Sequence, residues 1–326
     1  MFIMIYDIVI VGAGPSGLAA AIEAKRENDE LNVLIIEKEE YLGGTLNQCI
    51  HCAFGNDVFN EPLTGSEFAQ RFIDIIEELE VEVKTDTSVI GISEDRKLTY
   101  VSPNEGVVEI NAKAIIISTG IRELFSGNIS IPLNKFAGIY TVGTAHKFIN
   151  NQGYLPGKNI VILGTSDTSL IVARRLILEG AKIKAIIESS DELRATSEYA
   201  KKIVDDFDIP VLYSHKVNEV IGTERIEEIK ISKLEDIEED HGVESLGCDC
   251  LLISVNFLPD KRLGEILGLE INPETQGIHL NDDYTTNIDG IFASGGVVRG
   301  YDNADVCAKE GKDVAREVVK YCENLK

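Results

Sequence analysis

Short apolar runs alternate along this chain with longer segments in which apolar residues recur at helical spacing. The first run, residues 5–11, is apolar almost throughout, as a strand in a sheet covered on both faces requires. Residues 18–27 follow with helical character, and such an alternation is typical of parallel α/β units. The same reasoning predicts strands at residues 32–36, 113–118, 159–163, 182–187, 250–255 and 290–293, and helices at residues 66–79, 170–179 and 305–323.

The composition of the chain limits which kinds of molecule it can bind. The chain of 326 residues carries 31 Lys+Arg against 55 Asp+Glu, a net charge of −24. So acidic a protein repels phosphate backbones and anionic lipids. We therefore expect it to bind neither nucleic acids nor membrane surfaces. There is no apolar run of about 18 residues that would span a membrane. The first eleven residues hold no Lys or Arg, which argues against a secretory signal peptide. The six cysteines are too few for a disulfide scaffold, so we expect a reducing, cytoplasmic location.

A glycine motif follows the first predicted strand and opens the first predicted helix. In a GxGxxG motif the first glycine permits a tight turn, the second lets the backbone approach a pyrophosphate, and the third lets helix and strand pack closely. The helix N-terminus then attracts the phosphates, and an acid at the end of the second strand accepts hydrogen bonds from a ribose. The candidate cofactor-binding residues here are Gly12, Gly14, Pro15, Ser16, Gly17, Glu37 and Lys38.

Three further segments resemble a known superfamily. Gly43 and Gly44, which come soon after Glu37 and Lys38, resemble the FAD-binding segment of the pyridine nucleotide-disulfide oxidoreductases, and this adds Thr45 and Gln48 to the candidates. Ser118-Thr119-Gly120 resembles the second FAD motif of that superfamily, and residues 286–296 resemble the third. The third motif ends in Gly295-Gly296, where the superfamily commonly has Gly-Asp; the nearest acids are Asp302 and Asp305.

The resemblance implies a fold and a cofactor. It implies an α/β protein with two Rossmann-like dinucleotide-binding domains, the second inserted into the first, in the thioredoxin-reductase-like arrangement. The FAD-binding domain is expected at residues 1–120 and 247–326, and an NAD(P)-binding-like domain at residues 121–246. The Gln48–His51 segment is also similar to oxidoreductases related to glycerol-3-phosphate and sarcosine oxidising systems.

The predicted nicotinamide site departs from the glycine pattern. Gly164 is its only motif glycine, because Ser166 and Ser169 stand at the other two positions. A serine at the second position places a side chain where the backbone should approach the pyrophosphate. Glu188 ends the following strand, where an acid favours NADH over NADPH. NAD(H) binding and a vestigial domain that only holds its shape both remain open.

Cys49, His51 and Cys52 are the candidate catalytic residues, since the resemblance places them beside the flavin. Cysteines at CxxC spacing can close a disulfide, and His51 could move protons. Packed thiols and non-covalent flavin neighbours are the alternatives. Cys248 and Cys250, expected on one face of a strand, lack further ligands at zinc or iron–sulfur spacing, so no metal site is predicted.

These features predict an FAD-dependent oxidoreductase that passes electrons between a nicotinamide nucleotide, NADH being favoured, and a small molecule or small redox protein. One alternative is a flavin-dependent thiol–disulfide reductase that uses Cys49 and Cys52 with another donor. A second is a non-catalytic electron-transfer subunit with a vestigial NAD site. The resemblance implies a homodimer, whereas the second alternative would make the chain a subunit of a larger dehydrogenase.

Overall fold

The computed structural model describes residues 5–123, 137–235 and 242–325, and the chain forms two compact units. The first consists of Met1–Arg122 and Phe257–Lys326, and the second of Glu123–Asn256. The chain therefore returns from the second unit to the first after residue 256, whereas the sequence analysis expected this return after residue 246. The reason is the strand Cys250–Ile253, which pairs with two strands of the second unit.

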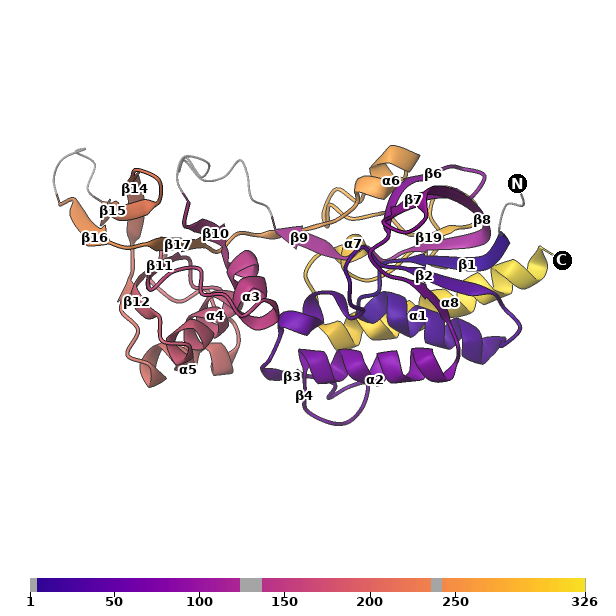
Figure 1. The fold of residues 1–326 in the computed structure, drawn as a ribbon, viewed down its shortest axis with the longest axis horizontal. Coiled ribbons are helices and arrows are strands. Elements are labelled where there is room, and N and C mark those ends of the chain that lie inside the picture. The colour runs from indigo at the N-terminus through magenta and orange to yellow at the C-terminus, as the bar shows by residue number, and fades with distance from the viewer. Residues whose placement is uncertain (1–4, 124–136, 236–241, 326) are drawn as a thin grey trace. The chain divides into compact units, whose positions relative to one another are not determined.

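A mixed sheet forms the centre of the first unit (Figure 1). Its order is β5-β2-β1-β8-β7-β6, with β19 paired to β8; β5, β2, β1, β8 and β19 run parallel. β1 has the bounds expected from its apolar run. The strands are β1 (Ile5–Val11), β2 (Val33–Ile36), β5 (Glu82–Lys84), β6 (Ser88–Ile92), β7 (Lys97–Ser102), β8 (Gly106–Ile117) and β19 (Ile291–Ala293).

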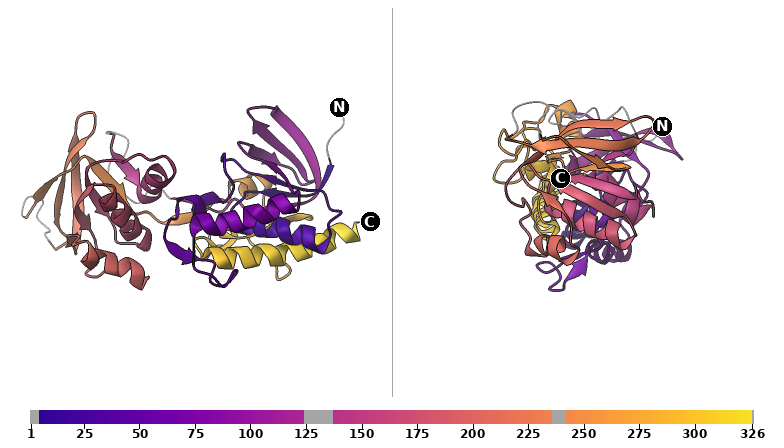
Figure 2. Two further views of the ribbon diagram at one scale, coloured as in Figure 1. Left: turned by 60° about the horizontal axis from the view of Figure 1, so that its bottom comes forward. Right: turned by 90° about the vertical axis from the view of Figure 1, so that its left-hand side faces the viewer.

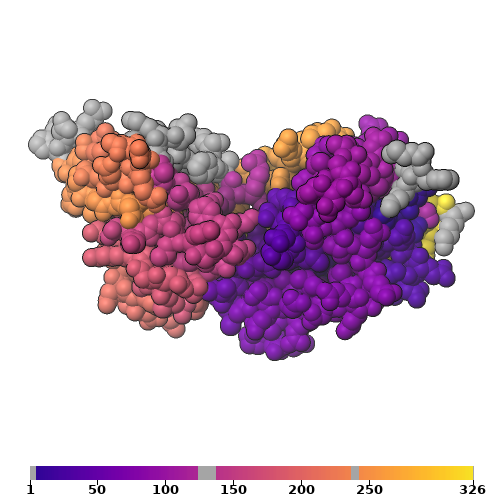
Figure 3. All heavy atoms as spheres, viewed as in Figure 1, coloured from indigo at the N-terminus to yellow at the C-terminus, as the bar shows by residue number. Residues whose placement is uncertain are grey.

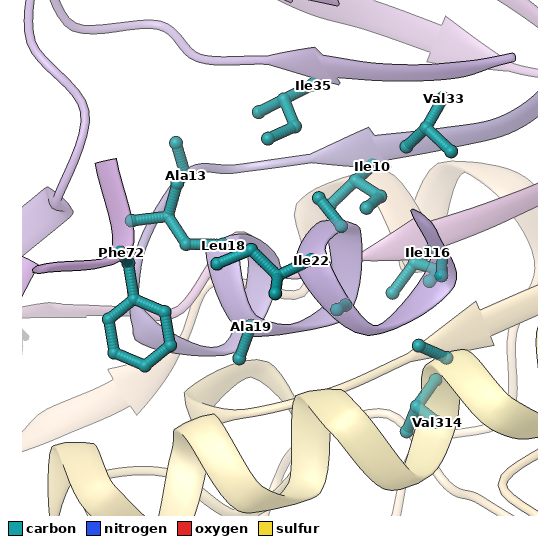
Figure 4. Close-up of a cluster of buried hydrophobic side chains, with 14 of the residues drawn as sticks. Ile10, Ala13, Leu18, Ala19, Ile22, Val33, Ile35, Phe72, Ile116 and Val314 are labelled. Carbon is teal, nitrogen blue, oxygen red and sulfur yellow. The ribbon is translucent and has the colours of Figure 1, made fainter. Parts of the chain in front are cut away.

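Three helices cover one face of this sheet: α1 (Pro15–Glu27), α2 (Gly65–Glu78) and α8 (Ala304–Asn324). Figures 1 and 2 show them side by side below the strands. In Figure 4, Leu18 and Ile22 of α1 lie between Ile10 of β1 and Val314 of α8, and all four side chains are buried. A methyl group at Gly311 would lie 2.1 Å from the Ser16 carbonyl oxygen, so α8 can approach α1 only through a glycine.

On the opposite face, side chains of β6 and β7, the antiparallel edge strands of the same sheet, pack with side chains of the parallel strands and with α6 (Arg262–Leu267). Figure 3 shows this unit as spheres from the side of Figure 1, where residues in the purple part of the colour bar, which include α2, form much of the visible surface. The remaining elements of the unit are short: η1 (Gly44–Gln48), β3 (Cys52–Phe54), β4 (Leu63–Thr64), β9 (Ile121–Glu123), β18 (Phe257–Pro259) and α7 (Gly296–Arg299). No helix among the described residues has the length and apolar character to cross a membrane.

The second unit repeats the parallel pattern. Its sheet has the order β10-β17-β11-β12-β13, and β14, β15 and β16 form a separate antiparallel sheet. The strands are β10 (Ile139–Thr141), β11 (Asn159–Leu163), β12 (Lys182–Ile187), β13 (Val211–Leu212), β14 (His215–Gly222), β15 (Ile226–Lys233), β16 (Glu244–Gly247) and β17 (Cys250–Ile253). The helices are α3 (Val142–Asn151), α4 (Asp167–Leu178) and α5 (Glu198–Asp206).

Candidate functional site

The motif segments of the first unit meet at the carboxyl ends of its parallel strands. The chain leaves β1 through α1 to reach β2 on one side, while β8 pairs with β1 on the other. This is a topological switch point, where open α/β sheets bind ligands. Gly12 follows β1 with φ +105°, and a methyl group there would lie 2.4 Å from the Ser118 carbonyl oxygen. Position 12 therefore requires a glycine for two reasons: its positive φ disfavours other residues, and a side chain would collide with the backbone of Ser118.

Glycines line an open cradle at this point. A methyl group at Gly14 or Gly120 would meet no atom within 4 Å, so the space beside both residues is free of protein. Gly44 lies against Gly14, since its added methyl group would be 3.3 Å from the Gly14 Cα. The amide of Gly43 donates to the Ala13 carbonyl at 2.8 Å and holds the second segment against the first.

The N-terminus of α1 faces this cradle without a side-chain cap. Gly14 occupies the N-cap position, Pro15 begins the helix, and the first turn has no acidic residue. The positive end of the helix dipole is therefore not offset by a local carboxylate, which suits a pyrophosphate. The open glycine cradle and the uncapped helix fit the diphosphate of FAD.

Glu37 lies at the end of β2 and is 5% exposed. One carboxylate oxygen accepts from the Ala13 amide at 2.7 Å and the other from the Glu39 amide at 2.9 Å. Each oxygen keeps a lone pair for a ribose hydroxyl. Lys38, the next residue, is exposed.

A chain of three buried hydroxyl groups crosses the switch point, and two of its members, Ser118 and Ser294, lie within the FAD motifs but were not among the candidate cofactor-binding residues. Ser16 donates to the Ser294 hydroxyl at 2.6 Å, and the Ser118 hydroxyl lies 3.0 Å from the same oxygen. The three serines belong to α1 and to the ends of β8 and β19. The sequence signal that could have found them is a serine directly after each apolar strand.

The third motif is held together by residues remote in sequence. The Gly295 amide donates to Glu310 of α8 at 2.6 Å. A methyl group at Gly296 would lie 2.8 Å from a methyl carbon of Ile121 and 3.4 Å from the Gly120 carbonyl carbon. Ile121 therefore fills the space that a side chain at position 296 would need.

Of the two acids considered near that motif, Asp305 serves another purpose. Its carboxylate is 2% exposed and accepts from the amides of Gly55, Asp57 and Val58 at 2.9–3.1 Å. It thus fastens the segment that follows Cys52 to the start of α8. Thr119 likewise donates to the Asp260 carbonyl at 2.7 Å, which anchors the second motif.

Cys49, His51 and Cys52 lie after η1, whose residues include Gly44, Thr45 and Gln48. The Cys49 thiol donates to the Thr45 carbonyl at 3.4 Å, and burial raises its pKa to about 12. Burial lowers the pKa of His51, so its ring is neutral at neutral pH. Both cysteines are free thiols and Cys52 is exposed. This environment favours a protonated Cys49 rather than an activated thiolate.

We expect iodoacetamide to alkylate Cys52 at neutral pH and to spare Cys49. With a pKa of about 12, only about one Cys49 thiol in 10⁵ is ionised at pH 7. Peptide mass spectrometry of the FAD-loaded protein after timed alkylation measures both rates, with urea-unfolded protein as the control in which both cysteines react. Rapid labelling of Cys49 in the folded protein would support a reactive pair instead.

The other cysteine pair does not share a face. β17 begins at Cys250, which packs among the residues of α3 and α4, whereas Cys248 packs with β14 and β15. Cys248 precedes the strand, so the alternation within strands does not apply to it. No group of three or more His, Cys, Asp or Glu side chains that could hold a metal ion occurs among the described residues.

In the second unit, β11 lies between β12, which it reaches through α4, and β17, so a second switch point exists. Glu188 directly follows β12 and is 1% exposed. It accepts from the Thr165 amide at 3.0 Å and from the Ser190 amide at 2.9 Å. Glu37 makes the same two kinds of bond in the first unit, to the residue after the first glycine and to the second residue after itself. The two acids are therefore structural counterparts.

Two differences separate the second site from the first. Glu188 also accepts from the Thr165 hydroxyl at 2.7 Å and pairs with Arg194 at 3.0 Å, so its carboxylate has more partners than that of Glu37. The N-terminus of α4 is capped by Ser166, whose hydroxyl accepts from the Ser169 amide. Gly164 retains the tight turn, with φ +97°.

Comparison with known proteins agrees with this architecture. Residues 6–311 match the model of the pyridine nucleotide-disulphide oxidoreductase family. The chain is 27% identical to thioredoxin reductase of Bacillus subtilis, covering 98% of this chain and 96% of that protein. It is 25% identical to a ferredoxin–NADP reductase of Picrophilus torridus, covering 90% and 85%. The crystal structure of T. acidophilum thioredoxin reductase superposes with a TM-score of 0.78 at 20% identity over 99% of both chains.

Two units with a switch-point site each define a two-domain α/β dinucleotide-binding protein of thioredoxin-reductase-like architecture. The chain belongs to the pyridine nucleotide-disulphide oxidoreductase family. It is an oxidoreductase, and its flavin cofactor is FAD.

Proposed function

We propose that this protein moves reducing equivalents between a nicotinamide nucleotide and a small redox protein or small molecule. The observation that carries the proposal is the pair of counterpart acids, Glu37 and Glu188, each bonded in the same way at the switch point of its unit. Two such sites suit two dinucleotides. The relatives named as thioredoxin and ferredoxin–NADP reductases support a small redox protein as acceptor.

FAD supplies the hydride and electron chemistry, and the chain supplies binding and orientation. We propose that the first unit holds the FAD diphosphate at the open N-terminus of α1 and at Gly14, Gly44 and Gly120. Glu37 would accept hydrogen bonds from the adenosine ribose. In the second unit, Glu188 would take the same role toward the nicotinamide nucleotide.

The preferred donor is NADH. Burial alone would raise the pKa of Glu188, but hydrogen bonds from Ser190 and Thr165 and the charge of Arg194 together lower it. Glu188 is therefore ionised at neutral pH, and an ionised acid at this position disfavours the additional phosphate of NADPH. Arg194 is already paired with that carboxylate.

Anaerobic mixing tests this function directly. NADH should bleach the flavin absorbance of the FAD-loaded protein, and NADPH at equal concentration should do so more slowly. Dithionite is the control that shows the flavin to be reducible. If neither NADH nor NADPH bleaches the flavin while dithionite reduces it normally, the proposed function is refuted.

A further inference from the structure

Three serine hydroxyls lie close together at the N-terminus of α4, and one of them caps the helix. The Ser166 Oγ lies 2.9 Å from the Ser169 Oγ and 2.8 Å from the Ser254 Oγ. It also accepts from the Ser169 amide at 3.2 Å. Ser166 follows β11 and Ser254 follows β17, the adjacent strands of the second switch point, and Ser169 is fully buried. The cluster therefore lies at the place where a dinucleotide diphosphate would approach the helix.

The corresponding place in the first unit is open. Gly14 has no side chain to cap α1, and an added methyl group would meet nothing within 4 Å. The first turn of α1 contains no acid, whereas that of α4 contains Asp167. Asp167 accepts from the amides of Thr196 and Ser197 at 3.1 and 2.9 Å. The α4 terminus thus already has a hydroxyl acceptor and a carboxylate, which are the groups that an incoming phosphate must compete with.

We propose that Ser166 sets the affinity of the second site, because its hydroxyl takes the place of a nucleotide phosphate at the N-terminus of α4. The inference rests on the proposed function and deepens it. Nucleotide binding then requires the Ser166 hydroxyl to leave the Ser169 amide and its two hydroxyl partners. The wild-type protein consequently binds a nicotinamide nucleotide more weakly than the geometry of Glu188 alone would allow.

Removing the hydroxyl should tighten binding. We expect Ser166→Gly to lower the dissociation constant of NAD⁺ about tenfold, which corresponds to about 1.4 kcal/mol and lies within the range of a helix N-cap bond. Ser166→Ala removes the same hydroxyl but keeps the Cβ atom, so it should give a smaller gain. Isothermal titration of the FAD-loaded protein with NAD⁺ measures this affinity without turnover.

Ser197→Gly provides a matched control. Ser197 is the N-cap of α5 in the same unit, its exposed side chain makes no cap bond, and glycine keeps the backbone amide that donates to Asp167, so the replacement should leave NAD⁺ affinity unchanged. Far-UV circular dichroism and flavin content confirm that each variant is folded and loaded.

The outcomes separate this proposal from the one on which it rests. Tighter NAD⁺ binding by Ser166→Gly than by wild type and Ser197→Gly supports the role of Ser166, even if wild-type binding is too weak to measure. Equal or weaker binding by both Ser166 variants overturns it, while bleaching of the wild type by NADH would still uphold the proposed function. If no variant binds NAD⁺ and NADH does not bleach the wild type, both proposals fail.

Discussion

A Gly14→Asp variant should fold normally and purify almost without flavin. Gly14 has φ −75°, which any residue adopts, and space is open beside it. Aspartate is a favoured N-cap residue, so it should cap α1 rather than destabilise it. The same carboxylate would repel the FAD diphosphate and use an amide that the diphosphate needs. We expect FAD affinity to fall on the order of a hundredfold or more, measured as flavin bound per folded protein and by titration of apoprotein with FAD.

A substitution of Gly17, in the same motif, should instead affect the stability of the fold. A methyl group at Gly17 would lie 2.0 Å from the Gly12 carbonyl oxygen, a contact that no side-chain rotation relieves. Gly17→Ala should therefore lower the free energy of unfolding by several kcal/mol or prevent folding. If Gly14→Asp retains FAD at wild-type affinity, the cradle beside Gly14 is not the diphosphate site. If both variants merely unfold, the distinction between an open and a packed glycine is wrong.

The parallel core was predictable because its signal is local. A strand covered on both faces is continuously apolar, and β1 and β11 have the bounds expected from that pattern alone. β8 begins earlier than expected, at Gly106, because its first half is an antiparallel partner of β7 and alternates in burial. Such a half-exposed segment lacks the continuous apolar run by which the buried half was found.

The glycine motifs were visible in the sequence, but the side chains that join them were not. Glu310 reaches Gly295, and Asp305 reaches Gly55, across sequence separations that no local pattern reports. The second compact unit extends beyond the boundary expected from the sequence for a similar reason. The apolar run at residues 250–253 predicts a buried strand but not the sheet it joins, and its partners β10 and β11 lie about a hundred residues earlier.

Asp305→Ala should produce the second large effect, a loss of about 3–5 kcal/mol in the free energy of unfolding. The carboxylate is 2% exposed, and its removal leaves the amides of Gly55, Asp57 and Val58 without their acceptor. Urea unfolding of the FAD-loaded protein measures the loss. Hydrogen exchange should accelerate first at these three amides, because they belong to the segment that the carboxylate fastens.

Asp302→Ala is the control, since Asp302 is only partly buried and accepts from the amide of its neighbour Asn303. Its effect should stay within about 0.5 kcal/mol, as for most substitutions away from buried features. Equal stability of the two variants would contradict the anchoring role of Asp305. A loss confined to Asp305→Ala, together with faster exchange at residues 55–58, would show that this acid holds the cysteine-containing segment in place. An acid whose two oxygens already accept from three amides does not replace the carboxylate missing from the third motif, and we therefore propose that the open space beside Gly120 and the N-terminus of α1 receive FAD there.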